Sequence, residues 1–433
     1  MSLEPPPTAR LFQGGEIASE ESPFLQSADV LVEGDRITRV GAGLEAPEGA
    51  QVIDCSGCVL MPSMFDVNVH AREPGQEYKE TIKSCSEAAI NGGVTGMVLM
   101  PNTVPAIDSG GLVQTVLDIV EEKSRIQVLQ TGCITKGRAG EELAAIAGMA
   151  AKGVPMLTDD GDPVADTRLL RRAMEYAKDF DLPLAMHCED KLLSGKGAMN
   201  EGPVSYRMGL PGIPSISEEI GIARDIRLAR YTGASIHVQH VSTAKGMESI
   251  RRAKNDGVRI TCEITPHHLI LNEEDIVDYD ANYKMNPPLR TAEDNEQLLQ
   301  GLIDGIFDVI ATDHAPHTEF EKQNGDFASA PFGITGLDTA VVSLYHHFIK
   351  PERFGWDLLV RRYSAQPRRM IGLDPVPVIE GGRAEFLVFA PGKSTTFSRE
   401  FMKSKCPNTP FIDRTLDGRI VTVVRGGEVL LQR

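Results

Sequence analysis

The sequence predicts an α/β protein built on a (β/α)8 TIM-type barrel, with a small β-sandwich formed from both termini. Two observations carry this prediction. Eight short apolar segments alternate with helical patterns in the middle of the chain, and strand-like segments of a different style flank them on both sides. A length of 433 residues exceeds one ordinary domain and fits a barrel with appendages.

The eight predicted barrel strands are short runs rich in β-branched and other apolar residues. They are Met61–Val69, Val94–Met100, Ile126–Thr131, Val154–Thr158, Leu182–Met186, Ile236–Val241, Val258–Ile264 and Phe307–Ala311. Most of the intervals between them carry helical periodicity, at Lys79–Asn91, Glu141–Lys152, Thr167–Asp179, Glu218–Tyr231, Ala244–Asn255 and Ala292–Asp304. Strands that alternate with helices in this way are typical of a parallel barrel.

The two flanks share a pattern of short alternating strands and glycine turns. The predicted strands are Ala28–Glu33, Arg36–Val40 and Gln51–Ile53 on one side, and Glu385–Phe389 and Ile420–Leu431 on the other. Neither flank carries enough apolar residues for a core of its own. We therefore predict one composite β-sandwich domain from residues 1–60 and 376–433, with residues 61–375 forming the barrel.

Two long loops interrupt the predicted barrel. Cys188–Ser217 is rich in glycine and proline, and His317–Gly333 is polar with Gly325 near its middle. The active sites of such barrels lie at the C-terminal ends of the strands, where these loops emerge. Both loops are expected to cover a substrate.

Charge and cysteine content restrict the function classes. Lys and Arg number 44 against 61 Asp and Glu, a net charge of −17 that opposes binding to nucleic acid or to an anionic membrane through the whole surface. No apolar run approaches the roughly 18 to 20 residues that span a bilayer, and residues 1–7 lack a signal-peptide apolar region. The seven scattered cysteines favour reduced thiols. A cytoplasmic enzyme is expected.

Metal-type side chains end five of the predicted strands: His70, Asp159-Asp160, His187, His240 and Asp313. One histidine on an apolar strand is usually structural, but five such positions at one end of a barrel are hard to explain by core packing. A site for one or two zinc ions is the leading interpretation. Residues 68 and 70 point to the same face of their strand, so Asn68 stands where a second histidine would complete a ligand pair.

The segment from Asp66 to Gly75 resembles the Asp-x-His-x-His strand of the amidohydrolase superfamily, and its Arg-Glu-Pro-Gly continuation is similar to dihydroorotases. Five further segments resemble motifs of that family in the same order, over residues 55 to about 415. They are Met100–Thr103, Thr265–Leu269, Tyr283–Arg290, Ala311–His317 and Ala330–Gly333.

The resemblance implies roles for the metal-type residues. Asp160 takes the place of the carboxylated lysine that bridges two metals in many superfamily members, which points to the dihydroorotase class with an aspartate bridge. His187 and His240 would complete one metal site, and His70 and Asp313 would belong mainly to the other. Asp159 would serve as a supporting hydrogen-bond acceptor. The resemblance also supports the pairing of the two flanks in one sandwich.

The expected chemistry is hydrolysis of a cyclic amide. A metal polarises the carbonyl and lowers the pKa of bound water, and Asp313 would take up the proton and pass it to the departing nitrogen. Arg72, with Asn102 and His317 as further donors, would bind a substrate carboxylate. Asn286, together with the backbone of Phe332 and Gly333, would hold the amide groups of the ring. Taken singly, Arg72, Asn102 and Asn286 also fit structural roles.

Three functions stay open. The first is a working dihydroorotase that interconverts dihydroorotate and N-carbamoyl-L-aspartate in pyrimidine biosynthesis, with one metal site weakened by Asn68. The second is an impaired homologue kept as a structural partner of aspartate transcarbamoylase. An allantoinase or hydantoinase is disfavoured by Asp160 and by the pair Arg72 and Asn102. A homo-oligomer is also compatible with the sequence.

Overall fold

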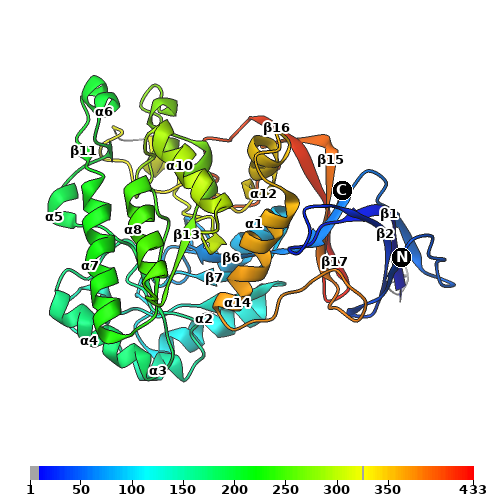
Figure 1. Cartoon of the computed structure of the whole chain (residues 1–433), viewed down its shortest axis with the longest axis horizontal. Helices are drawn as coiled ribbons and strands as arrows, with labels where there is room; N and C mark the ends of the chain where they lie inside the picture. The colour runs from blue at the N-terminus through cyan, green and yellow to red at the C-terminus, as the bar shows by residue number, and fades with distance from the viewer. Residues whose placement is uncertain (1–8, 324–325) are drawn as a thin grey trace.

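The computed structural model describes residues 9–323 and 326–433. Residues 1–8, which the sequence analysis assigned to the terminal sandwich, and Gly325 of the second loop lie outside the described residues. Figure 1 shows an elongated molecule with helices packed around strands at one end and a β-sheet at the other. No helix in the described ranges is long and apolar enough to cross a membrane.

In the described residues, seven parallel strands and three isolated bridging pairs close the barrel. The strands are β6 (Met64–Val69), β7 (Val94–Leu99), β8 (Gln127–Gln130), β9 (Leu184–Met186), β12 (Ile236–Val238), β13 (Ile260–Ile264) and β14 (Val309–Ile310). They form one ladder of β6, β7 and β8 and another of β9, β12, β13 and β14. Leu157 bridges Gly132 and Leu184 between the ladders, and Val69 pairs with His314 to complete the ring. The predicted barrel is confirmed.

Helices cover the outside of this ring, because each buries an apolar stripe against the strands. The longer ones are α1 (Ile82–Asn91), α2 (Gly110–Lys123), α4 (Thr167–Lys178), α7 (Ile216–Thr232), α8 (Ala244–Asn255) and α10 (Ala292–Ile303). The shorter elements are α3 (Ile146–Ala150), α5 (Lys191–Ser194), α6 (Pro203–Met208), α9 (Pro266–Ile270), α11 (Glu319–Gln323), α12 (Ala340–Leu344), α13 (Trp356–Val360), α14 (Gln366–Met370), β10 (Met199–Asn200) and β11 (Gly212–Ile213). Side-chain caps fix several starts: Thr81 accepts from the Ser84 N–H at α1.

Three predictions for the barrel need correction, and one of its helices was missed. The predicted strand Val154–Thr158 is reduced to the bridging contacts of Leu157. The predicted helix Glu141–Lys152 shrinks to the five residues of α3. Helix α2 was not predicted. The predicted strand Met61–Val69 is two strands interrupted at Ser63, since Met61 and Pro62 pair with the terminal sheet instead of the barrel.

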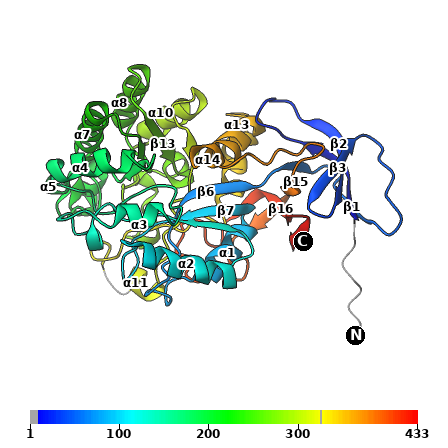
Figure 2. The same cartoon turned by 90° about the horizontal axis from the view of Figure 1, so that it is seen from below.

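Both ends of the chain meet in one eight-stranded sheet. Its strands are β1 (Ala9–Ile17), β2 (Gln26–Glu33), β3 (Arg36–Gly41), β4 (Gln51–Asp54), β5 (Val59–Pro62), β15 (Glu385–Thr396), β16 (Thr415–Arg425) and β17 (Glu428–Gln432). Figure 2 shows the N-terminal strands beside β15 and β16. The pairing of the two flanks is therefore confirmed, through β5 against β15. The division of the chain at residues 60 and 376 stays a prediction.

One predicted strand of the C-terminal flank, Ile420–Leu431, is a hairpin. It turns at Gly426 and Gly427, whose φ angles are 56° and 75°. A side chain at Gly427 would also meet the carbonyl oxygen of Gly34 at 1.7 Å. Glycine is required at this turn by both the backbone conformation and the close approach of a neighbouring strand.

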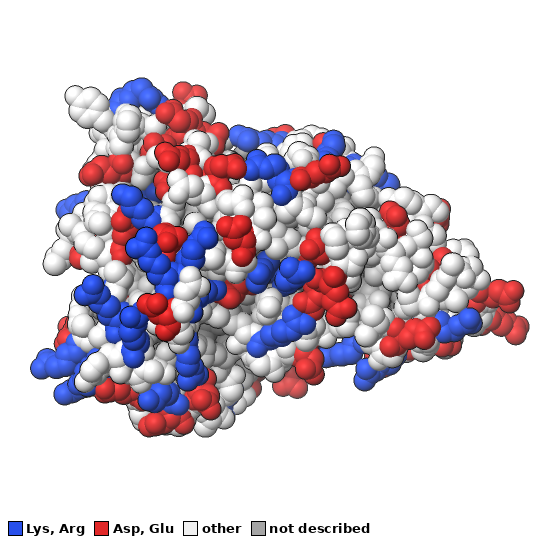
Figure 3. Space-filling view, in the orientation of Figure 1, with Lys and Arg blue, Asp and Glu red and all other residues white. Residues whose placement is uncertain are grey.

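Surface charge is unevenly distributed on the face shown in Figure 3. Lys and Arg side chains gather over the part of this face where Figure 1 places α7 and α8. These helices carry the exposed Arg227 and Arg230, and Lys245 and Arg252. Acidic side chains crowd the top edge of the helical end and the tip of the sheet. The net charge of −17 is therefore not a uniform negative field.

A buried ion pair joins the barrel to the terminal sheet. Arg368 on α14 and Glu385 at the start of β15 are each 2% exposed, and the Arg368 Nη2 donates to Glu385 Oε1 at 2.8 Å. The Thr95 hydroxyl donates to the same oxygen at 2.7 Å. This carboxylate depends on its partners, because an unpaired buried charge is strongly unfavourable.

We expect Arg368→Met to lower the free energy of unfolding by about 3–5 kcal/mol, since it leaves Glu385 charged and buried without its main partner. The measurement is thermal unfolding followed by calorimetry. Arg383→Met is the matched control, because Arg383 lies 4.0 Å from the other oxygen of Glu385 and is 56% exposed. Equal and small effects of both substitutions would contradict a structural role for the buried pair.

Candidate functional site

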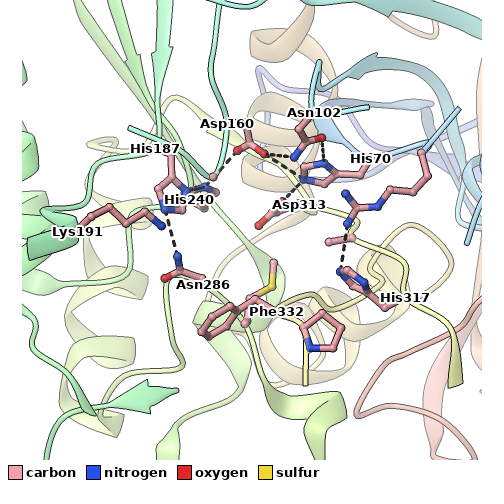
Figure 4. A pocket seen from close by; sticks show the side chains of 15 residues that line it. His70, Asn102, Asp160, His187, Lys191, His240, Asn286, Asp313, His317 and Phe332 are labelled. Carbon is pink, nitrogen blue, oxygen red and sulfur yellow. Dashed lines mark hydrogen bonds and ion pairs between the residues drawn. The ribbon is translucent and has the colours of Figure 1, made fainter. Parts of the chain in front are cut away.

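The C-terminal ends of the barrel strands open into one cavity of about 390 Å³. This volume falls in the ordinary range for a small-molecule site. Figure 4 shows His70, Asp160, His187, His240 and Asp313 converging at one side of the cavity. The lining residues are His70, Arg72, Asn102, Asp160, Gly161, His187, Lys191, His240, Met285, Asn286, Asp313, Ala315, His317, Pro331 and Phe332.

Asp160, His187 and His240 form a buried cluster whose potential ligand atoms all lie within 4.8 Å of one another. His187 Nδ1 is 3.0 Å from His240 Nε2, which is 3.8 Å from Asp160 Oδ1. Two imidazole nitrogens and one carboxylate oxygen are a donor set that suits zinc and related divalent ions. The residues present therefore fit a metal ion.

Electrostatics in this cluster favour positive charge. Burial disfavours protonated His240, but Asp160 and Asp313 overcome that effect and raise the pKa of His240 to about 9. Burial likewise opposes ionised Asp160, yet His240 and His70 hold the pKa of Asp160 well below its usual value. A proton held between imidazole and carboxylate is what a divalent cation displaces when it binds.

His70 and Asp313 extend the cluster on the other side of Asp160. His70 Nε2 lies 3.0 Å from Asp313 Oδ1 and 3.5 Å from Asp160 Oδ2. The ring is oriented by Asn102, whose Oδ1 lies 2.8 Å from His70 Nδ1 while its Nδ2 donates to Asp160 Oδ2 at 3.0 Å. Asn102 thus lines the cavity with both polar atoms already engaged by neighbouring site residues.

Three site residues adopt left-handed backbone conformations. The φ angles are 60° at Arg72, 31° at His240 and 46° at Asp313. Such conformations cost of the order of 1–3 kcal/mol for residues with a side chain and are concentrated at functional sites. Each one turns a side chain into the cavity directly after a barrel strand.

Arg72 is a buried cation of the cavity wall. Its Nε donates to the carbonyl of Pro316 at 3.3 Å and its Nη2 lies 3.3 Å from His317 Nε2. No carboxylate in the described parts of the chain forms an ion pair with this guanidinium, which is only 8% exposed. Burial and the nearby cations Arg72 and Lys79 hold the pKa of His317 well below its usual value. The wall of the cavity formed by Arg72 and His317 is therefore suited to bind an anion.

The opposite wall is formed by Asn286 and Phe332. Gly333 is not among the residues that line the cavity, and its N–H donates to the carbonyl of Lys284 at 2.9 Å. The contact of its backbone with the amide groups of a ring stays a prediction. Gly333 is required structurally, since its φ is 154° and a Cβ would lie 2.5 Å from the Ala315 carbonyl oxygen. It fixes the backbone that carries Phe332.

Asn68 is fully buried behind the cavity and does not line it. Its Nδ2 donates to Glu263 Oε1 at 2.7 Å, and that carboxylate also accepts from the His240 backbone N–H at 3.0 Å. The second oxygen of Glu263 contacts His237 Nε2 at 3.0 Å. Within the described residues nothing donates to Asn68 Oδ1, so one buried acceptor is left free.

Asp159 and the two long loops lie where the sequence places them. Asp159 accepts from the Ile134 N–H at 2.8 Å and the Thr135 N–H at 3.0 Å, a supporting position beside Asp160. The two long loops both reach the cavity, through Lys191 from the first and through His317 and Phe332 from the second.

Three residues of the site were not predicted from the sequence. Glu189 and Lys191 follow His187, and Glu263 lies on β13. A carboxylate two positions after a ligand histidine was the available signal for Glu189. Glu263 offered no such signal, because its contacts with Asn68 and His240 depend on how the strands align.

The comparisons with known proteins agree with this geometry. The dihydro-orotase-like family matches residues 57–246. The chain is 40% identical over 423 residues to a dihydroorotase from Pelobacter propionicus, which covers 98% of this chain and 99% of that protein. It is 41% identical over 427 residues to one from Carboxydothermus hydrogenoformans, 98% of each. The L-hydantoinase (dihydropyrimidinase) structure from Arthrobacter aurescens shares the fold, with a TM-score of 0.86 at 20% identity over 98% and 96% of the two chains.

We expect Asn68→His to raise metal content and turnover. An imidazole at position 68 can donate one N–H to Glu263 and present its other nitrogen to an ion beside His70. That gain should strengthen this second position by at least about tenfold. The measurement is metal content by elemental analysis together with kcat.

Asn68→Leu is the control, since it removes the amide without adding a ligand. Metal content and kcat that are unchanged in Asn68→His would show that position 68 does not govern the site.

Proposed function

We propose that this chain, which belongs to the dihydroorotase family, catalyses the reversible cyclisation of N-carbamoyl-L-aspartate to dihydroorotate in pyrimidine biosynthesis. One observation carries the proposal: a buried guanidinium, Arg72, which forms no ion pair with the carboxylates that the structure describes, faces the same cavity as the cluster of Asp160, His187 and His240. A cyclic amide that also bears a carboxylate fits this cavity, because its carboxylate can bind Arg72 while its amide carbonyl faces the cluster.

Zinc is the metal we propose, held by Asp160, His187 and His240, with His70 and Asp313 beside a second and weaker position. A bound divalent ion polarises an amide carbonyl and makes water a stronger acid. Asp160 lies between the two positions, since one of its oxygens faces His240 and the other faces His70. This arrangement supports the bridging role.

Substrate binding follows from the two walls. Arg72 would bind the carboxylate of dihydroorotate through its planar fork. The neutral His317 would supply one further hydrogen bond, and Asn102 would act mainly by orienting His70 and Asp160. Asn286 and Phe332 would hold the ring from the opposite wall, with Phe332 covering its apolar face.

Asp313 is the residue we propose for proton transfer. Its carboxylate lies 3.0 Å from His70 Nε2 at the mouth of the eighth strand. In the hydrolytic direction it would accept a proton from the attacking water and deliver it to the ring nitrogen as the carbon–nitrogen bond breaks. In the synthetic direction it would take the proton from the carbamoyl nitrogen as the carbon–nitrogen bond forms, and would give that proton to the hydroxide that departs from the attacked carboxyl group as water.

A second candidate function is an impaired dihydroorotase homologue that serves as a structural partner of aspartate transcarbamoylase. Asn68 favours it, because a carboxamide is a poor replacement for a zinc-binding imidazole. The first candidate is preferred, since a scaffold has no use for Arg72 facing the cluster of Asp160, His187 and His240.

Assembly into homo-oligomers and a cytoplasmic location stay predictions. All seven cysteines are free thiols, which agrees with a reducing compartment.

The test uses protein reconstituted with zinc, dihydroorotate, and an uncharged cyclic imide as the comparison substrate. Wild type should prefer dihydroorotate. Arg72→Met should lower kcat/KM for dihydroorotate by about 10- to 100-fold, the effect of losing a hydrogen-bonded charge pair, and change the imide reaction little. The exposed Arg399→Met is the control. A preference of wild type for the imide would favour a hydantoinase-like enzyme, and full inactivity with complete metal occupancy would favour the structural partner.

Asp313→Asn separates metal binding from proton transfer. An amide keeps an oxygen ligand but cannot accept a proton at neutral pH. The variant should fold, retain metal at Asp160, His187 and His240, and lose about 10²- to 10⁴-fold in kcat in both directions. Substantial activity with metal bound would mean that another base, such as His314, His317 or Asp159, serves the reaction.

A further inference from the structure

Glu189 is a buried carboxylate beside the cavity that the proposed reaction leaves without a role. Its side chain is 7% exposed. Three donors converge on its Oε2: His187 Nε2 at 3.2 Å, Asn286 Nδ2 at 3.1 Å and Lys191 Nζ at 2.8 Å. One oxygen thus contacts a residue of the metal cluster, a residue of the substrate wall and a cation at the cavity entrance.

We infer that Glu189 is a positioning residue, which sets the metal-binding face of His187 and the hydrogen-bonding face of Asn286 together. This inference rests on the proposed function, which it deepens by naming the substrate group that Asn286 recognises. Figure 4 shows the three partners of Glu189, namely Lys191, His187 and Asn286, on the same side of the cavity.

For His187, Glu189 determines which ring nitrogen carries the proton. A carboxylate only accepts hydrogen bonds, so the nitrogen that faces Glu189, Nε2, must carry the proton. In neutral imidazole the lone pair then resides on Nδ1, which points at the cluster, 3.0 Å from His240 Nε2. Carboxylate partners of this kind fix the ring orientation of metal-binding histidines.

For Asn286, Glu189 determines which amide atom, Nδ2 or Oδ1, faces the cavity. The amide nitrogen and oxygen have nearly the same shape, so neighbours decide which of them faces the cavity. Glu189 Oε2 accepts from Nδ2 at 3.1 Å. The His187 Nε2–H lies 3.3 Å from the same nitrogen but is directed to Glu189, so the carboxylate alone decides the orientation of the amide. Oδ1 is therefore the atom left for the substrate. Asn286 offers an acceptor, and its partner must be an N–H of the ureide group instead of a ureide carbonyl.

Lys191 is the third member of the arrangement. It is half-exposed and lines the cavity, and its charge balances that of Glu189. Because Lys191 offsets its charge, Glu189 accepts hydrogen bonds without adding a net negative charge beside an anionic substrate. An uncompensated carboxylate at this position would repel the substrate carboxylate.

The experiment compares Glu189→Gln with Glu201→Gln, an exposed glutamate of the same loop. Metal affinity is measured by competition of zinc with a chromophoric chelator, and dihydroorotate affinity by calorimetry and KM. Glu189→Gln should weaken zinc binding by about 10- to 100-fold. It should also weaken dihydroorotate binding by about tenfold. A glutamine side chain can donate as well as accept, so it no longer requires Asn286 to point Nδ2 toward it, and the Asn286 amide can rotate. Glu201→Gln should change neither quantity.

A double-mutant cycle with Asn286→Ala tests the link between the two walls. Once Asn286 is removed, Glu189→Gln should no longer affect dihydroorotate binding but should still weaken zinc binding. Additive losses of dihydroorotate binding would overturn the role of Glu189 toward Asn286. Wild-type zinc affinity in Glu189→Gln would overturn its role toward His187.

Two further outcomes are decided by the same design. If Glu189→Gln does not fold, Glu189→Asp serves instead, since it keeps the acceptor but withdraws it by one methylene group. It should give the same losses in smaller measure, and wild-type values for both affinities would overturn the inference. If wild type binds zinc but not dihydroorotate, the proposed function fails while the zinc comparison still decides the role toward His187.

Discussion

The carboxylate of Asp160 connects the two halves of the site. Its two oxygens face histidines that come from opposite parts of the barrel, His70 after β6 and His240 after β12. Asn102 adds a hydrogen bond from a third strand end. This convergence exists only because the ring of strands is closed, with Leu157 bridging the two ladders immediately before Asp159 and Asp160. Closure of the barrel is therefore what brings together donors separated by up to 170 positions in sequence.

The same closure explains why the cluster of Asp160, His187 and His240 forms with an asparagine at position 68. Asn68 lies on β6 with its amide held by Glu263, and Glu263 holds the backbone of His240 as well. Among the side chains of Asn68, Glu263 and His237, one buried polar atom, Asn68 Oδ1, is without a partner in the described residues. Position 68 reaches the cluster of Asp160, His187 and His240 only through Glu263, and offers it no side-chain atom. The residues expected to bind substrate and move protons line the cavity beside that cluster.

Much of the fold followed from the sequence, because buried parallel strands and amphipathic helices leave strong periodic signals. Prediction failed where those signals are weak. Helix α2 begins at Gly110-Gly111, which reads as a loop, and the fourth strand pairs through a single residue, Leu157. The boundary at Ser63 was missed, since the apolar run continues across it while the pairing partner changes from the terminal sheet to the barrel.

The site was predicted in part for a related reason. His70, Asp160, His187, His240 and Asp313 share a local pattern, a metal-type residue directly after an apolar strand, and the structure brings all five together. Glu189 and Glu263 were missed because their roles depend on side-chain contacts across elements. The engagement of both polar atoms of Asn102 was equally invisible, since its partners lie 32 and 58 positions away.

We propose that a single metal position, at Asp160, His187 and His240, is sufficient for dihydroorotate hydrolysis by this chain. The most direct measurement is a titration of metal-free protein with zinc, with bound metal and dihydroorotate hydrolysis followed in the same samples. Activity should rise in proportion to zinc and reach its maximum near one ion per chain. Activity that appears only as a second ion binds, or no activity at full occupancy, would contradict it.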